Sequence, residues 1–440
     1  MAGSRFPDIP AGAITAAKRL MIDTVGVAMA ARSCLDMDSI ARCCPQQMSN
    51  RGAVVWSTGQ TTSEMCAAFA NSSYAAALEF DSLHAQTATH AGIIIVPAVL
   101  AMAQSVMRDG ESILLSVALG TDLMCRLAQC THKNSGWFYT SLHGGIAAAA
   151  VAAHVAGADA AGIADAMGLA FANSGGTQQP ASERTPAKRI QGALAALQGV
   201  MCGKLALEGL RGPREILEGP FGLFAMYEEG DCEHLLTGLG SRFEGENVSY
   251  KAFPICQCSH AAVEAMLALR SKHGLVASAV RRVSVHISPY MHRLVGAPFT
   301  AGATPQVDAQ FSVQYCVARA LERGRLGIAE IEASTVMDPA LSDVLRRVVV
   351  RVDDANTGKY APVELVVETS DGRLLRHIAH DFPGSIEQPL DDDRLFAKFH
   401  HCLEAAGAPH LAAEELLDSM LHMESHNTAT LVRRIGACVR

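Results

Sequence analysis

The stretch Gly144-Gly-Ile-Ala-Ala-Ala-Ala-Val-Ala-Ala-His-Val-Ala156 has no charged side chain and, apart from one isoleucine and one histidine, nothing larger than valine. Alanine is the strongest helix former, so the segment is predicted to be helical. A helix that is apolar on every side has no face for water and belongs in the middle of a bundle. Its small side chains would allow neighbouring helices to pack closely, and the sequence therefore predicts a helical fold around this segment.

Further helices are predicted on both sides of this central segment. Apolar residues recur at three- and four-residue spacing, the period of an amphipathic helix, in residues 11–31, 97–107, 111–130, 158–173 and 190–208. The succession of helices continues to about Gly240. This part of the chain is predicted to form one helical domain.

The pattern changes near residue 250. β-branched residues alternate with others in residues 280–288 and 348–353, and residues 363–369 and 374–378 flank Asp371-Gly372, which is typical of a hairpin. Helical stretches at 260–273 and 308–323 would pack on one face of these strands. Amphipathic helices return at 395–405 and 412–421. We predict a mostly α fold in which residues 1–249, completed by 392–440, form the helical domain and residues 250–391 form a second, α+β domain.

The composition limits the class of protein. The chain has 440 residues, of which 49% are hydrophobic and 18% charged, as expected for two folded domains. The net charge of -8 comes without a basic run, which argues against nucleic acid or an anionic membrane as partner. No stretch approaches the roughly 20 uninterrupted apolar residues of a membrane span, and the N-terminus lacks an apolar signal core. We expect a cytoplasmic protein whose partner is a small molecule.

The sequence favours neither a metal nor a cofactor. The 13 cysteines are an odd number, scattered in apolar surroundings, and are expected to be reduced. Cys256-Gln-Cys258-Ser-His260 has poor spacing for structural zinc and lacks a second ligand pair. A dinucleotide fingerprint, a phosphate loop and a nucleophile elbow are all missing. We therefore expect a site without metal or cofactor.

A first cluster of possible catalytic residues lies in residues 79–90. Glu79, Asp81, His84 and His90 fall between Ala75-Ala-Ala77 and an isoleucine run, where burying charge demands partners. A carboxylate can orient a histidine and leave its other ring nitrogen free to move a proton. The alternative is a capping loop in which Asp81 and His84 satisfy backbone groups.

Basic residues form two further clusters. Arg184, Lys188 and Arg189 enter a long apolar helix, and cations at a helix start oppose its dipole, so an anionic ligand there would explain them. An ordinary solvated loop is the alternative. Lys251 lies at the expected seam between the domains, where ligand sites often form, although a plain linker with a solvated lysine also fits.

These clusters, in this order, resemble the MmgE/PrpD family, which includes 2-methylcitrate dehydratase, cis-aconitate decarboxylase and iminodisuccinate epimerase. The resemblance runs nearly end to end. Its motifs are Leu20-Met-Ile-Asp-Thr-Val-Gly26, residues 79–90 followed by Val96-Pro-Ala-Val-Leu100, residues 136–144, Lys188-Arg189 followed by Gly199, Gly209-Leu-Arg-Gly-Pro213, Leu217-Glu-Gly219, Lys251-Ala-Phe-Pro254, Phe311-Ser-Val-Gln-Tyr315 and Pro383-Gly384.

The resemblance implies a helical domain with a smaller α/β lid domain closing over a site between them, usually in a homodimer. It places Glu79 at the family's first aspartate and His90 at the catalytic histidine. Lys188 and Lys251 fall at two lysines that face the substrate, and Tyr290 at a lid tyrosine. The implied substrate is a small polycarboxylate, and no cofactor is implied.

Departures from the family pattern affect the choice of reaction. The family usually reads Leu-Asp-Phe-Asp-Asp-Thr and His-Pro-Ser, whereas this chain has Ser82-Leu83 and Ala91-Gly92 at the corresponding positions. Phe138 stands where a family histidine is common, and His143 stands nearby. These changes alter the groups that would bond to a substrate, so no family reaction transfers by name.

The expected activity is that of a dehydratase-type, carbon–oxygen lyase that removes a proton next to a carboxylate. His90 would transfer the proton, oriented by Glu79 or Asp81, while Lys188 and Lys251 stabilise negative charge. Other cations or donors could add contacts to the substrate, and the expected set is His84, Arg184 and Arg189.

Three alternatives to this activity stay open. An epimerase would need an acid or base on the opposite face of the substrate, for which His143 or Tyr290 is the candidate. A cis-aconitate-type decarboxylase is the next alternative. A binding protein without catalytic activity is the third, and an apolar pocket with Lys188 turned away would favour it.

Overall fold

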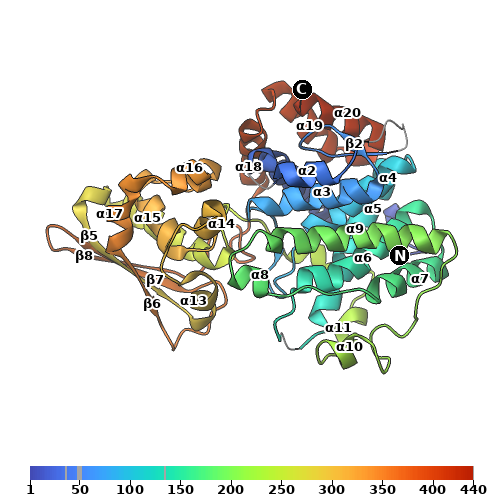
Figure 1. Ribbon diagram of the computed structural model, residues 1–440, viewed down its shortest axis with the longest axis horizontal. Helices are drawn as coiled ribbons and strands as arrows, with labels where there is room; N and C mark the ends of the chain where they lie inside the picture. The colour runs from blue at the N-terminus through green and yellow to red at the C-terminus, as the bar shows by residue number, and fades with distance from the viewer. Residues whose placement is uncertain (35–36, 47–51, 133–134, 440) are drawn as a thin grey trace.

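A computed structural model describes residues 1–34, 37–46, 52–132 and 135–439 of the chain. Most of them form a helical part, which lies beside a smaller part that contains a sheet (Figure 1). The helices of the first part are α1 (Ala11–Ala30), α2 (Met37–Cys43), α3 (Glu64–Ala77), α4 (Gly92–Ser105), α5 (Gly110–Gln129), α6 (Tyr139–Ala156), α7 (Ala160–Phe171), α8 (Gln179–Ser182), α9 (Ala187–Leu207), α10 (Leu223–Met226) and α11 (Glu233–Leu236).

Helix α6 forms the centre of the helical part, and all but two of its residues are buried. Helix α9 packs along it through glycine and alanine. At Gly199 a Cβ atom would stand 2.3 Å from the Cβ of Ala148, and at Gly203 one would stand 2.6 Å from that of Ala152. Only residues without bulky side chains permit this approach, which explains why the apolar surface of α6 is built from alanine.

The C-terminal helices α18 (Asp392–Ala405), α19 (His410–Leu421) and α20 (Thr428–Cys438) return to the helical part. Figure 1 shows them in red beside the blue N-terminal helices. The Phe399 ring of α18 packs against Gly26 of α1, where a Cβ would stand 2.8 Å from the ring. The first and last segments of the chain therefore share one core.

The smaller part is built on a four-stranded sheet in the order β6-β5-β7-β8. Strand β5 (Val280–Ile287) runs parallel to β6 (Val348–Val352) and antiparallel to β7 (Val363–Thr369), which forms a hairpin with β8 (Leu374–Ala379). Alternate residues of β7 are buried, so one face of the sheet meets the core. Helices α12 (His260–His273) and α15 (Val313–Arg323) pack on the sheet. The other helices here are α13 (Pro289–Val295), α14 (Pro305–Gln310), α16 (Ala333–Val336) and α17 (Ser342–Arg347).

Two short strand pairs belong to the helical side. Strand β1 (Ala53–Val54) pairs with β2 (Thr61–Thr62), and β3 (Leu83–His84) pairs with β4 (Val248–Ser249). The second pair joins segments that lie far apart in the sequence, at the point where the chain enters the smaller part.

The predicted fold class, mostly α with an α+β second part, is confirmed. Individual elements differ from prediction. Helix α4 begins at Gly92, ahead of Pro97, which lies inside it. The helix predicted over 308–323 is two helices, because the Ser312 side chain accepts from the Tyr315 N–H and caps the start of α15. Helices α3 and α20 had not been predicted.

Helix α9 has the length and apolar composition of a membrane span, and half of its most apolar stretch is buried inside the protein. It packs against α3, α4 and α6. These contacts are those of a core helix in the helical part.

Gly199 should tolerate no larger side chain. The Gly199→Ala variant should lower the free energy of unfolding by about 1–3 kcal/mol, because its Cβ would overlap the Ala148 side chain and approach the Ala149 backbone N at 2.8 Å. Chemical denaturation measures this change. Gly145→Ala is the matched control, since its Cβ would meet nothing closer than 3.7 Å. Equal stability of the two variants would contradict the packing described for α6 and α9.

Candidate active site

The turn that follows α3 carries two carboxylates into the interior. Glu79 has a φ of 50°, in the left-handed region that residues other than glycine seldom adopt. Its carbonyl oxygen accepts a hydrogen bond from Lys251 Nζ at 2.9 Å. The same ammonium lies 3.3 Å from Glu79 Oε2 and 3.6 Å from Asp81 Oδ1. One lysine therefore holds the backbone of the turn and both of its carboxylates.

The β3–β4 pair explains why Lys251 lies at this turn. Leu83 pairs with Ser249 in an antiparallel register. Continuing that register by two residues along each chain sets Asp81 opposite Lys251. The lysine is only 2% exposed, and although burial lowers its pKa, the carboxylates of Glu79 and Asp81 raise it above the ordinary value. Lys251 is therefore a charged ammonium in the interior.

Glu79 is shared by two lysines. Lys188, in the first turn of α9, forms an ion pair with Oε1, while Lys251 approaches Oε2. Burial raises the pKa of the Glu79 carboxyl, but the two ammonium groups outweigh it and bring the pKa down to about 2. Glu79 is ionised at neutral pH, and it holds two cations side by side.

His90 is oriented by the other carboxylate of the turn. Its Nδ1 lies 2.6 Å from Asp81 Oδ2, and its backbone N–H donates to Thr140 Oγ1 at 3.1 Å. Burial raises the pKa of Asp81, yet His90 and Lys251 lower it overall, so that Asp81 is a carboxylate. Within the described residues no hydrogen bond engages His90 Nε2, and the side chain remains 11% exposed. That nitrogen is free to transfer a proton.

Aromatic and sulfur side chains surround this charged cluster. The Phe138 ring centroid lies 6.4 Å from that of His90, and Lys188 Nζ lies 5.0 Å from the centroid of the Phe311 ring. The Cys256 thiol is close enough to Lys188 for the ammonium to help lower its pKa, although a hydrogen bond with the Cys258 thiol is the larger cause. Apolar walls strengthen the electrostatic interactions inside the site.

His84, Arg184 and Arg189 have structural contacts. His84 Nδ1 lies 2.8 Å from Thr87 Oγ1, and its Nε2 faces Glu244 at 3.4 Å. Arg189 donates to Gln310 Oε1 at 3.0 Å and so joins α9 to α14 of the smaller part. The carbonyl of Arg184 accepts from Thr304, also in the smaller part. The structure does not bring these three into direct contact with the His90 pair, and their role as substrate ligands stays a prediction.

His143 and Tyr290 lie outside the charged cluster. His143 is fully buried with its ring 5.2 Å from the Tyr139 ring, and in the described part of the chain neither of its nitrogens has a hydrogen-bond partner. Burial alone lowers its pKa to about 3. Tyr290 of α13 neighbours Cys256 and Cys258, and burial raises its pKa above the ordinary value. Of the two, only Tyr290 borders a residue that adjoins the lysines.

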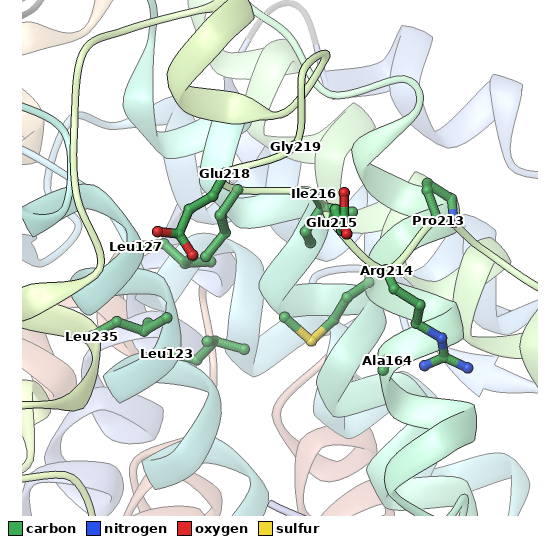
Figure 2. Close-up of a pocket in the computed structure, with 12 residues that line it drawn as sticks. Leu123, Leu127, Ala164, Pro213, Arg214, Glu215, Ile216, Glu218, Gly219 and Leu235 are labelled. Carbon is green, nitrogen blue, oxygen red and sulfur yellow. The ribbon is translucent and has the colours of Figure 1, made fainter.

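The most prominent cavity lies elsewhere. Figure 2 shows a hollow of about 510 Å³ between α5, α7 and the loop after α9, with Leu123 and Leu127 on its wall and Arg214, Glu215 and Glu218 around it. Its lining residues include none of the charged cluster. The site is therefore identified by its side chains rather than by cavity volume.

Sequence reasoning missed Lys398 of α18. Its Nζ donates to the carbonyl oxygen of Phe80, in the middle of the turn, at 2.6 Å. The available signal was its position, because Leu395, Lys398, Phe399 and Cys402 share the buried face of an otherwise amphipathic helix. A lysine in an apolar stripe indicates a buried partner.

Comparisons with known proteins identify the family. The N-terminal domain of the MmgE/PrpD family matches residues 1–234 and its C-terminal domain matches residues 253–422. The chain belongs to the MmgE/PrpD family. The resemblance seen in the sequence is thereby confirmed.

Similar curated proteins share one printed name. A cis-aconitate decarboxylase of Aspergillus terreus is 22% identical over 98% of this chain and 93% of its own length. The cis-aconitate decarboxylases of Mus musculus and Homo sapiens are 22% and 23% identical, over 95% and 88% of this chain and 87% and 82% of their own lengths. These relatives are enzymes of acid metabolism.

The ion pairs of Glu79 should make stability depend on pH. Since its pKa in the folded protein is about 2 and its ordinary value is 4.5, the stabilisation is complete above pH 4.5 and is lost as the pH falls toward 2. In Glu79→Gln the decline of unfolding free energy from pH 5 to pH 3 should be shallower than in the wild type. Urea unfolding across this range measures the slope. The exposed Glu387→Gln variant is the control, and an unchanged slope in Glu79→Gln would refute the pairing.

Proposed function

We propose that this protein is a lyase that acts on a small di- or tricarboxylic acid by proton transfer next to a carboxylate. The observation that carries the proposal is the His90–Asp81 pair at 2.6 Å, beside two lysines that share Glu79. The pair provides an acid–base group, and the lysines provide positive charge where electrons would accumulate.

The charge balance of the cluster suits an anionic substrate. Glu79 and Asp81 are balanced by Lys188 and Lys251, so the site without substrate is close to neutral. A substrate carboxylate that reaches the lysines competes with Glu79 for hydrogen bonds. Glu79 keeps the two ammonium groups together until the substrate arrives, which avoids repulsion between like charges in a low dielectric.

Decarboxylation is the reaction that best fits a single acid–base group. The bond between a carbon and its carboxylate breaks, carbon dioxide leaves, and the electron pair spreads over a neighbouring double bond. The protonated His90 then delivers one proton to carbon at the end of that system, and Lys188 and Lys251 stabilise the charge meanwhile. Every step uses groups of this chain, and a second imidazole is not required. The names of the relatives support the same reaction for this chain.

Dehydration is the second candidate and was the first expectation from the sequence. Neutral His90 would remove a proton next to a carboxylate, and the same group would protonate the hydroxide as it leaves from the same face. Decarboxylation comes first here because of the relatives' names. Epimerisation has less support, since His143 has no contact with the cluster in the described residues and Tyr290 would have to act alone on the far face. The polar cluster gives a purely binding role no support.

Exchange in deuterated water separates these reactions. Incubation with aconitate-like, citrate-like and malate-like acids, followed by NMR, should show loss of carbon dioxide from an unsaturated tricarboxylate with one deuteron incorporated at carbon. Loss of hydroxide from a hydroxy acid would favour dehydration, and exchange with inversion alone would favour epimerisation. Complete inertness toward the whole panel would refute the proposed function.

His90→Gln should lower kcat by about 100- to 10,000-fold, the usual effect of removing a general acid–base group. Glutamine retains the size of the side chain and a donor for Asp81 but cannot transfer the proton. Circular dichroism and thermal unfolding check the fold. His422→Gln at the exposed end of α19 is the control, and full activity in His90→Gln would assign proton transfer to another residue.

A further inference from the structure

Lys398 reaches the turn of the charged cluster from the far end of the chain. Its ammonium donates to Phe80 O at 2.6 Å, lies 4.0 Å from the centroid of the Phe80 ring and stands 2.6 Å from Asp23 Oδ1 of α1. Lys398 and Asp23 are separated by most of the sequence. Both side chains are at least 94% buried.

A pair of buried charges is not explained by stability. Taking two ions out of water costs several kcal/mol each, and replacing such a pair by neutral groups of similar size is often neutral or stabilising. Burial raises the pKa of the Asp23 carboxyl even though Lys398 opposes the rise. In the described residues Asp23 has no further hydrogen-bond partner. The pair therefore calls for another explanation.

The geometry of the turn provides one. Lys251 holds the carbonyl oxygen of Glu79, and Lys398 holds the next carbonyl oxygen, that of Phe80. Two successive peptide groups are thus fixed by ammonium donors, on a turn whose first residue has the unfavourable φ of 50°. Charge-assisted hydrogen bonds are the strong ones, and they can maintain a conformation that the backbone alone would not prefer.

We propose that Lys398, neutralised by Asp23, is a positioning residue that sets the 79–81 turn so that Asp81 meets His90 and Glu79 meets its two lysines. It touches neither the substrate nor the reacting atoms. The inference rests on the proposed function only for the use to which the turn is put. It assigns helix α18 a role in the site built by the N-terminal half of the chain.

A second lysine pair in the same region provides a matched control. Lys18 of α1 donates to Leu421 O at 2.7 Å and to Glu424 Oε1 at 2.8 Å, so it also ties α1 to the C-terminal helices. It has no contact with the turn among the described residues. Lys18→Met/Glu424→Gln removes the same kinds of charge and leaves the turn anchored.

The test compares Asp23→Asn/Lys398→Met with this control. Removing both charges leaves no unpaired ion, so the variant should fold with a melting temperature close to that of the wild type. We expect kcat to fall about 10- to 100-fold, as a small misplacement of reacting groups does, with a smaller change in KM. The amides of residues 78–84 should exchange with deuterated water faster than in the wild type, as read by mass spectrometry. The control should change neither quantity.

Other results would overturn the proposal. They are wild-type kcat and exchange in Asp23→Asn/Lys398→Met, or equal losses in the control. Lys398→Arg is a second variant in case the first does not fold; it keeps the charge, and local exchange near residues 78–84 as slow as in the wild type together with higher kcat than the double variant is the expected result. Faster exchange confined to other segments would refute the assignment. If the wild type processes no acid at all, the proposed function fails, while the exchange comparison still decides the role of Lys398.

Discussion

Burial of charge at the turn from Glu79 to Asp81 is the constraint on which the centre of this structure depends. Two carboxylates lie in an apolar interior, and they persist there because Lys188, Lys251 and His90 compensate them. None of these charges would be tolerated alone. The surrounding elements must therefore deliver partners to one point with a tolerance of a fraction of an ångström.

The helical core makes that delivery possible. Helices α6 and α9 approach closely because Gly199 and Gly203 face Ala148 and Ala152, so their relative position is fixed by backbone contact rather than by adaptable side chains. Lys188 extends from the first turn of α9. A rigid support of this kind holds an ammonium where a loop would let it drift.

The remaining partners arrive from distant parts of the sequence. The antiparallel β3–β4 register brings Lys251 opposite Asp81, and α18 packs on α1 and brings Lys398 to Phe80. Arg189 ties α9 to Gln310 of the smaller part, so the wall that carries Phe311 is attached to the same helix as Lys188. The site is thus enclosed from both parts of the chain, as expected for a ligand site at a domain seam.

The sequence by itself determined the class of fold and the segment that matters most for function. Periodic apolar residues are a local property, and the ranges predicted for α1, α5, α9, α12 and β7 agree with the structure within three residues. The cluster of residues 79–90 could be singled out because charge beside alanine and isoleucine demands partners. Which partners meet it was decided only by the tertiary structure: Lys398 joins the turn, whereas His143 packs beside Tyr139 without contacting it. The physical reason is that a buried contact between distant residues depends on how whole helices and strands pack, and no local pattern encodes that distance.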